Sequence, residues 1–244
     1  LGVGLVQLCD LPELDFFAGS GTPVRNAAAG RLGQLSEVAA SHGIQYELGT
    51  KGVGVDRLTA YLEMAQALGS RLVRSMVVTA GHRPSTDEAV ALLREVAPRY
   101  QSAGVALALE TYEQIATAEL VEIVDRVGCD AVGICLDPGN VVARLEHPAD
   151  TVAMTAPYVL NVHVKDFAFS RSPDMVGFRF AGVRLGEGLL DLTSLLRSVR
   201  PEQRAVNLIV EQWVPWQGDS ETTIAEEVLW AEHAVRRLLS AVPG

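Results

Sequence analysis

The chain has 244 residues and a formal net charge of −10, and 48% of its residues are hydrophobic. This length suits one large α/β domain with a substantial core, so we expect residues 1–244 to form a single domain. The acidic balance argues against nucleic acid as the main partner, because phosphate binding requires a basic face.

Three further features exclude other classes. No apolar run reaches the roughly 18 residues of a transmembrane helix, so we expect no membrane partner. The amino terminus lacks the basic region and cleavage site of a signal peptide. The three cysteines are too few and too scattered for a disulfide framework. We therefore expect a cytoplasmic protein.

Apolar strand-like runs alternate with amphipathic helix-like stretches along the chain. The predicted strands cover residues 2–8, 44–48, 71–78, 105–109, 132–136, 159–162 and 206–210. A loop at residues 10–15 is expected after the first strand. The predicted helices cover residues 26–42, 55–68, 85–104, 117–127, 148–156, 192–199 and 222–239. Strand–helix units that repeat at about 30 residues are typical of a parallel sheet with crossover helices.

Polar side chains end many of these strands, which favours a (β/α)₈ TIM barrel over an open doubly wound sheet. Only seven units are counted, and the chain starts at Leu1 directly on a strand. We therefore expect a TIM barrel that lacks its first β/α unit in this chain and has seven parallel strands. Exposed strand edges at such a gap would favour a homo-oligomer.

The segment 167–188 interrupts the repeat. It is rich in Gly, Phe, Arg and Ser, and residues 177–184 alternate in the manner of a hairpin. The alternatives are a lid and a disordered surface segment, and the position after a strand that carries a candidate site residue favours the lid.

Four predicted strands deliver a metal-competent side chain at or near their carboxyl end, namely Glu110, Asp137, His163 and Glu211. Pro138 and Gly139 cannot continue a strand, so Asp137 is expected where the strand ends. In a barrel these four side chains would converge on the axis. Two Glu, one Asp and one His suit Mn²⁺, our first expectation, or Mg²⁺, Co²⁺ or Zn²⁺. Such an ion would polarise a carbonyl or stabilise an enediolate, while the carboxylates move protons.

Further residues are candidates for substrate contacts, each with an ordinary alternative. His82 lies in a glycine-containing loop and could instead be a solvated loop residue. Lys165 follows His163 by two residues on an alternating strand, so both can point the same way, although Lys165 could pair with Asp166. Trp213 could cover a sugar face or only the barrel mouth. Arg184 could meet a carboxylate or simply lie exposed on the hairpin.

The strand-end motifs resemble those of the sugar isomerase/epimerase superfamily with xylose-isomerase-like barrels. They are Ala108-Leu109-Glu110, Leu136-Asp137-Pro138-Gly139-Asn140, Val162-His163-Val164-Lys165-Asp166 and Val210-Glu211-Gln212. The resemblance implies that the four residues are metal ligands and that Glu110 and Glu211 are the catalytic acid/base pair. Many members have His three residues after the Asp; this chain has Asn140, which can bind a substrate hydroxyl but cannot shuttle a proton.

A later stretch resembles one subgroup more narrowly. The residues are Met175-Val176-Gly177-Phe178, Gly182 and Leu185-Gly186-Glu187-Gly188, with Trp213 and Trp230-Ala231-Glu232. The subgroup acts on oxidised sugars and sugar acids, and it includes proteins like 3-oxo-isoapionate decarboxylase and enzymes that cleave 3-keto C-glycosides.

The resemblance implies first a divalent-metal-dependent sugar isomerase or epimerase that forms an enediolate on a keto-sugar or sugar derivative. The alternative is a metal-dependent decarboxylase or lyase of a 3-keto sugar acid or 3-keto glycoside. A non-catalytic sugar-binding barrel or partner subunit is a hypothesis of another class. The superfamily's endonucleases use more His ligands and a basic DNA-facing surface, which this acidic chain lacks.

Overall fold

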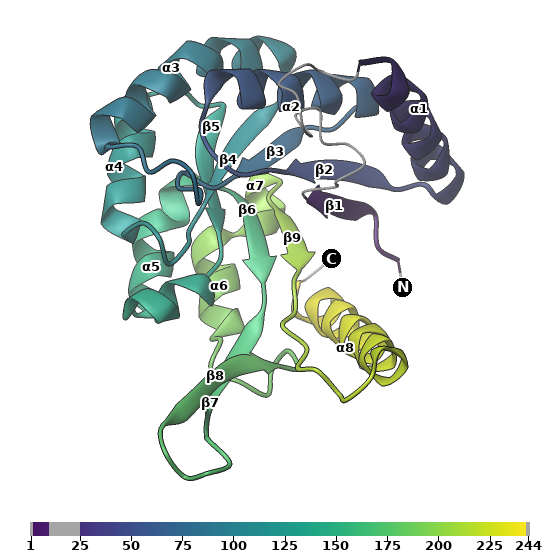
Figure 1. The fold of residues 1–244 in the computed structure, drawn as a ribbon, viewed down its shortest axis with the longest axis vertical. Helices are drawn as coiled ribbons and strands as arrows, with labels where there is room; N and C mark the ends of the chain where they lie inside the picture. The colour runs from purple at the N-terminus through teal and green to yellow at the C-terminus, as the bar shows by residue number, and fades with distance from the viewer. Residues whose placement is uncertain (1, 10–24, 243–244) are drawn as a thin grey trace. The chain divides into compact units, whose positions relative to one another are not determined.

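The computed structural model describes residues 2–9 and 25–242, and Figure 1 shows the course of the chain. The predicted loop at residues 10–15 lies outside the described residues. The chain divides into two compact units, residues 2–135 and residues 136–244, called here the N-terminal and C-terminal units. The expectation of a single domain stays a prediction, and each unit is described by itself.

The N-terminal unit is a parallel sheet with a helix after each of its first four strands. Its strands follow the chain order β1 (Leu5–Cys9), β2 (Gln45–Gly49), β3 (Leu72–Ser75), β4 (Ala106–Glu110) and β5 (Val132–Leu136), the last residue of which begins the other unit. Its helices are α1 (Arg25–His42), α2 (Val55–Leu68), α3 (Thr86–Ala103) and α4 (Thr117–Val127). Figure 1 shows the helices on the outer side of these strands.

Local sequence explains where these helices begin and end. In α3 the Ser85 side chain accepts a hydrogen bond from the Glu88 backbone N–H, which caps the first turn. Gly104 ends the same helix with a left-handed φ of 66°, a conformation that glycine adopts without strain. Leu93 and Tyr100 on its inner face are 0% exposed. Burial of one such leucine contributes about 1.5–3 kcal/mol, so this face holds the helix on the sheet.

The C-terminal unit contains two parallel strands, β6 (Val159–Val164) and β9 (Asn207–Val210), in which His163 pairs with Ile209. Its helices are η2 (Asn140–Arg144), α5 (Pro148–Thr155), η3 (Ala156–Tyr158), α6 (Leu192–Val199), α7 (Pro201–Arg204) and α8 (Ser220–Ala241). The short helices η2 and α7 were not predicted. With the five strands of the other unit, the two strands make the seven parallel strands that the sequence predicts, counted over the described residues.

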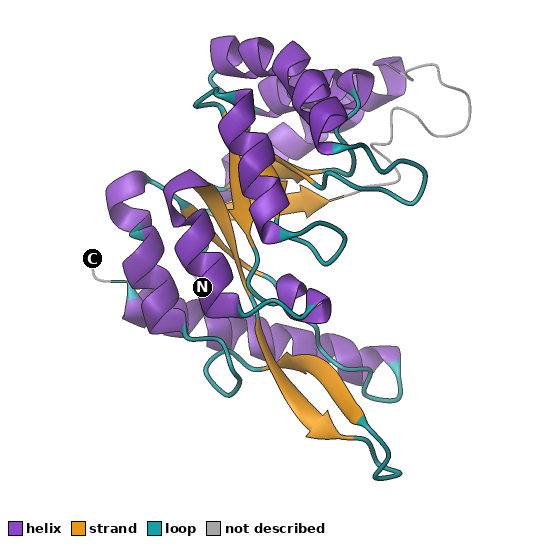
Figure 2. Cartoon of the chain, turned by 90° about the vertical axis from the view of Figure 1, so that its left-hand side faces the viewer, coloured by secondary structure: helices purple, strands orange, loops and turns teal. Residues whose placement is uncertain are grey.

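The excursion at 167–188 is an ordered antiparallel hairpin of β7 (Asp166–Arg171) and β8 (Phe178–Val183), so the disordered alternative is wrong for these strands. Figure 2 shows it as the pair of orange strands that project from the C-terminal unit. Phe180 packs on Phe167 and Phe169 with ring centroids 5.4 and 5.1 Å apart, and on Trp213 at 5.6 Å. These contacts fix the base of the hairpin against the segment that follows β9.

Most predicted boundaries lie within a few residues of the observed ones. The largest differences are at β1, predicted over residues 2–8 and observed at Leu5–Cys9, and at β3, predicted over residues 71–78 and observed at Leu72–Ser75. The pairing of β3 with β2 involves only Leu48 and Gly49, so the ladder ends before the apolar run does. In the part of the chain that the structure describes, no helix has the length and apolar character needed to cross a membrane.

Candidate active site

Three of the four predicted ligands belong to the C-terminal unit and lie at strand ends. Asp137 directly follows β5, His163 is the penultimate residue of β6, and Glu211 directly follows β9. The Glu211 backbone N–H donates to the Val164 carbonyl at 3.1 Å, which extends the parallel ladder by one residue. This register places the Glu211 side chain beside His163.

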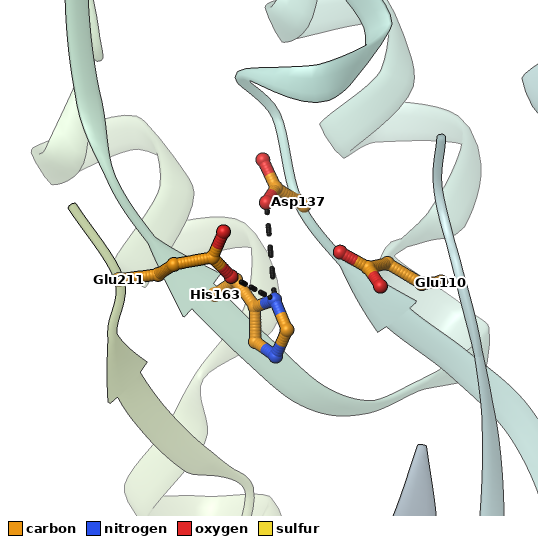
Figure 3. A group of neighbouring side chains, drawn as sticks. All are labelled: Glu110, Asp137, His163 and Glu211. Carbon is orange, nitrogen blue, oxygen red and sulfur yellow. Dashed lines mark ion pairs between the residues drawn. The ribbon is translucent and has the colours of Figure 1, made fainter. Parts of the chain in front are cut away.

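The three side chains point toward one another, as Figure 3 shows. His163 Nδ1 lies 2.7 Å from Glu211 Oε2 and 3.8 Å from Asp137 Oδ2. Each residue offers one ligand atom, and these atoms lie within 4.8 Å of one another. Asp137 is 0% exposed and His163 is 1% exposed. These two residues are therefore shielded from water, whereas the Glu211 side chain is 35% exposed.

The loop after β5 orients the Asp137 carboxylate. Its Oδ1 accepts hydrogen bonds from the backbone N–H groups of Gly139 at 2.9 Å and Asn140 at 3.1 Å. A carboxylate held at one oxygen by two amides keeps a fixed direction. The other oxygen, Oδ2, faces Lys165 at 2.8 Å and His163 at 3.8 Å.

Lys165 places a buried ammonium group against this cluster. Its Nζ lies 2.6 Å from Glu211 Oε1, 2.8 Å from Asp137 Oδ2 and 3.2 Å from Asn140 Oδ1. The same nitrogen lies 4.0 Å from the centre of the Trp213 ring, a cation–π distance. The prediction that His163 and Lys165 point the same way is confirmed, since both contact Glu211.

Burial and neighbouring charges shift the pKa values of Lys165 and Glu211 in opposite directions. Burial lowers the pKa of Lys165, but the charges of Asp137 and Glu211 outweigh it, so the net shift is upward. Burial raises the pKa of Glu211, but the hydrogen bond and charge of His163, together with Lys165, outweigh it and lower this pKa to about 2. Lys165 therefore stays an ammonium and Glu211 a carboxylate at neutral pH.

The residues fit a divalent metal ion. Asp137 and Glu211 offer carboxylate oxygens and His163 an imidazole nitrogen, which are ligands that Mn²⁺, Mg²⁺ and Zn²⁺ accept. All three face one point, where Asp137 and His163 are buried and Glu211 is partly exposed. A metal ion there would neutralise the two carboxylates, a role that the Lys165 ammonium serves in this structure.

Glu110 belongs to the N-terminal unit, where it ends β4 and is 4% exposed. Its Oε2 lies 3.4 Å from Nε of Arg74, a buried residue of β3. Arg74 also donates to the Thr50 carbonyl at 3.2 Å and to Cys9 Sγ at 2.9 Å. Sequence analysis missed Arg74, although a charged residue inside a buried strand is itself a signal, because burying an unpaired charge is costly.

The remaining predicted contact residues have protein partners. His82 Nε2 lies 3.0 Å from Glu88 Oε1 in the N-terminal unit, and His82 is exposed. Arg184 lies 3.0 Å from Glu226 Oε2 on α8. A substrate role for either residue stays a prediction.

Asp166 does not serve as the partner that sequence analysis considered for Lys165. Its Oδ1 accepts from the N–H groups of Phe167 at 2.9 Å and Leu190 at 3.0 Å, and its Oδ2 from Gly186 at 2.7 Å and Gly188 at 3.0 Å. A Cβ on Gly188 would clash with Asp166 Oδ1. This glycine lets the loop 184–190 close around the carboxylate.

Parallel β/α units with polar side chains gathered at the carboxyl ends of the strands are the arrangement of TIM-barrel enzymes. A family model described as xylose isomerase-like TIM barrel matches residues 49–234, and the chain belongs to this family. This finding confirms the predicted fold class and the predicted superfamily.

The chain is 43% identical to "3-oxo-isoapionate decarboxylase" of Pectobacterium atrosepticum, over 99% of this chain and 84% of that protein. It is similar in fold to a xylose isomerase domain protein from Planctomyces limnophilus, with a TM-score of 0.74 and 16% identity over 98% and 89% of the two chains. A xylose isomerase-like protein from Mycobacterium smegmatis, solved in complex with magnesium, gives a TM-score of 0.67 and 19% identity over 99% and 86%.

Proposed function

We propose that the protein is a divalent-metal-dependent decarboxylase of a 3-oxo sugar acid. The observation that carries this proposal is the buried ammonium group of Lys165 beside the acidic cluster, because an acid substrate needs a cation for its carboxylate. The 43% identity to a protein named as a decarboxylase of such an acid supports it.

The chemistry of a 3-oxo acid matches such a site. The ketone lies two carbons from the carboxyl carbon, so the electron pair of the breaking carbon–carbon bond can move toward the ketone oxygen. Carbon dioxide leaves, and the adjacent carbon then takes up one proton. A divalent ion in the cluster would supply positive charge beside the developing enolate oxygen.

We further propose that Glu110 is the fourth metal ligand, with Asp137, His163 and Glu211. Glu110 is buried at the end of β4 and pairs in register with Cys135 of β5, two residues before Asp137 in the chain. Parallel strands end at the same edge of a sheet, which supports a shared site. Mn²⁺ remains the first expectation for the ion.

The other residues have distinct roles in this proposal. Lys165 binds the substrate carboxylate, and the ring of Trp213 excludes water from the face of the ammonium that it covers. The side-chain amide of Asn140 accepts a hydrogen bond from a substrate hydroxyl or donates one to it. Glu110 and Glu211 are the candidates for relaying a proton from water to carbon.

The test is a reaction in D₂O with the metal-loaded protein, a 3-oxo sugar acid and the corresponding neutral keto-sugar. We expect carbon dioxide from the acid and one deuterium in the product, with no change in the neutral sugar. Epimerisation of the neutral sugar without carbon dioxide would instead support the predicted isomerase or epimerase. Binding of both sugars without conversion would support the sugar-binding barrel.

A further inference from the structure

Arg74 and Glu110 lie on the same face of the sheet in the N-terminal unit. Cys9 pairs with Gly49 in the parallel register, and Gly49 pairs with Arg74. Arg74 pairs in turn with Ala108, and Glu110 follows Ala108 by two residues. The small residues of this row leave room for the two charged side chains, both of which are buried. Branched apolar residues usually fill the inner positions of barrel strands, so a buried ion pair in their place indicates a function.

The guanidinium group of Arg74 connects four neighbouring strands. From β3, its Nε lies 3.4 Å from Glu110 Oε2 at the end of β4. Its Nη1 donates to the Thr50 carbonyl directly after β2 at 3.2 Å, and its Nη2 donates to Cys9 Sγ on β1 at 2.9 Å. A guanidinium group is planar, and its donors have fixed directions. The contacts with Thr50 and Cys9 therefore set the direction from which the third nitrogen faces Glu110.

Gly49 makes this reach possible, because the guanidinium crosses β2 at that residue. A Cβ on Gly49 would clash with Cys9 Sγ and would lie 3.0 Å from Nη2 and 3.2 Å from Cζ of Arg74. Any larger residue at this position would push the guanidinium and the thiol apart. The sequence thus provides both the long cationic side chain and the gap that it needs.

Neutralisation of Glu110 alone would not require this arrangement. A single contact from any cation balances the charge of a carboxylate, whereas three nitrogens held by three partners also fix its direction. Asp137 is held in a comparable way, by two backbone amides at Oδ1. Partners that orient a metal ligand change metal affinity by about 10–100-fold. The contacts of Arg74 are therefore of the kind that prepares a carboxylate for an ion.

We propose that Arg74 is the positioning residue of Glu110, holding its Oε2 in a fixed direction so that the carboxylate meets a metal ion without rearrangement. This inference rests on the proposed assignment of Glu110 as the fourth ligand. Arg74 itself contacts neither the ion nor the substrate in this proposal.

Calorimetric titration with Mn²⁺ tests the proposal. Arg74→Lys keeps the positive charge, but its single nitrogen cannot occupy the three positions of the guanidinium nitrogens, so Mn²⁺ should bind at least about tenfold more weakly. Gly49→Ala keeps both charges and displaces the guanidinium, so it should weaken binding as well. The matched controls are Arg57→Lys, at an α2 residue that donates to the Thr50 hydroxyl at 3.3 Å, and Gly54→Ala, where a Cβ would meet nothing within 4 Å. Both controls should leave the affinity unchanged, and circular dichroism checks that each variant is folded.

A double-mutant cycle separates positioning from a general structural role. Glu110→Ala should weaken Mn²⁺ binding, and Arg74→Lys should cause no further loss in that background, because no carboxylate remains to be positioned. An equal loss with and without Glu110, or normal affinity in both Arg74→Lys and Gly49→Ala, overturns the role of Arg74 and leaves the proposed ligands intact. Normal affinity in Glu110→Ala contradicts the proposed ligand set itself, and the role of Arg74 with it.

Discussion

The ammonium group of Lys165 lies within 2.8 Å of carboxylate oxygens of both Asp137 and Glu211. A divalent ion held by these carboxylates would compete with the ammonium for the same oxygens. Lys165 would then be available to contact another anion, and a substrate carboxylate is the anion that the proposed reaction supplies.

Lys165→Met tests this residue. Decarboxylation should fall by about 10²-fold or more, because the carboxylate loses its counter-ion, while metal affinity stays equal or rises. Calorimetric metal titration and kcat/KM measured together separate the two effects. Lys51→Met, at the chain's other lysine, is the matched control. Loss of metal binding in Lys165→Met with unchanged kcat/KM at saturating metal would contradict the assigned role.

Glu211→Gln separates metal binding from proton transfer. The amide keeps a ligand oxygen but cannot take up a proton, so metal affinity should fall modestly and the single-turnover rate by about 10²-fold or more. Asp137→Asn should lose metal and activity together, because Asp137 is assigned only as a ligand. Near wild-type turnover in Glu211→Gln with metal bound would remove the proton-transfer role.

Among single residues, the sequence identifies those that obey a repeated pattern, in which a polar side chain ends or follows an apolar strand. Asp137, His163 and Glu211 could be found because each follows or ends an apolar strand. Arg74 and Asp166 could not be assigned in the same way. The surroundings of Arg74 come from three neighbouring strands, and the partners of Asp166 come from a loop about 20 residues further along the chain.

Among the elements, the loop at 184–190 depends on the single carboxylate of Asp166. Asp166→Asn should destabilise the protein by about 2–4 kcal/mol, since an amide cannot accept all four backbone hydrogen bonds and leaves buried donors unsatisfied. Urea unfolding gives the change. Asp174→Asn is the control, because that exposed residue accepts one backbone bond at 3.2 Å and should change stability by less than about 0.5 kcal/mol. Equal effects in both variants would refute the structural role of Asp166.

The contact between α2 and α3 contains a buried tyrosine whose hydroxyl group makes stability depend on alkaline pH. The Tyr100 hydroxyl donates to the Leu58 carbonyl at 2.8 Å, and burial raises the pKa of this phenol. Because the folded pKa lies above the unfolded value of about 10, this contribution is complete below pH 10 and is lost as the pH rises further.

Tyr100→Phe should therefore cost about 1 kcal/mol at neutral pH and should lose less stability than the unaltered protein between pH 9 and pH 11. Chemical unfolding at several pH values measures both. Tyr158→Phe, at a half-buried tyrosine, should keep the alkaline loss. An identical alkaline profile for Tyr100→Phe and the unaltered protein would contradict this account.

Helices and strands with strong periodicity, such as α2 and α4, were predicted with their observed limits. The hairpin was only partly predicted, because its alternating pattern covers β8 while its order comes from Phe180 packing on Phe167 and Trp213. Such contacts join residues that are separated in the chain, so they produce no periodic pattern in the sequence from which they could be predicted.

For the whole molecule, metal binding should stabilise the folded state. At about 100 times its dissociation constant, a single bound ion adds roughly 2.7 kcal/mol to the free energy of unfolding. Chelation of the loaded protein should lower the thermal midpoint, and adding Mn²⁺ back should restore it. Asp137→Asn should show no such shift. An unchanged midpoint in the unaltered protein would contradict the metal centre.

The seven strands and their parallel direction were predictable because the β/α repeat is visible in the sequence. The reaction was not predictable from the repeat, because the same strand-end side chains suit the isomerase, epimerase and decarboxylase alternatives. The contacts of Lys165 emerge only in the folded chain, which brings Asp137 after β5 and Glu211 after β9 beside its ammonium group.

The carboxylate of Asp166 also controls how fast four backbone amide hydrogens exchange with solvent. The amide hydrogens of Phe167, Gly186, Gly188 and Leu190 share this one acceptor, so none is released alone when the side chain swings away. Their exchange with solvent should therefore proceed at one common opening rate, as a cooperative unit. Any movement of the hairpin that displaces the Asp166 side chain must break all four hydrogen bonds in a single event.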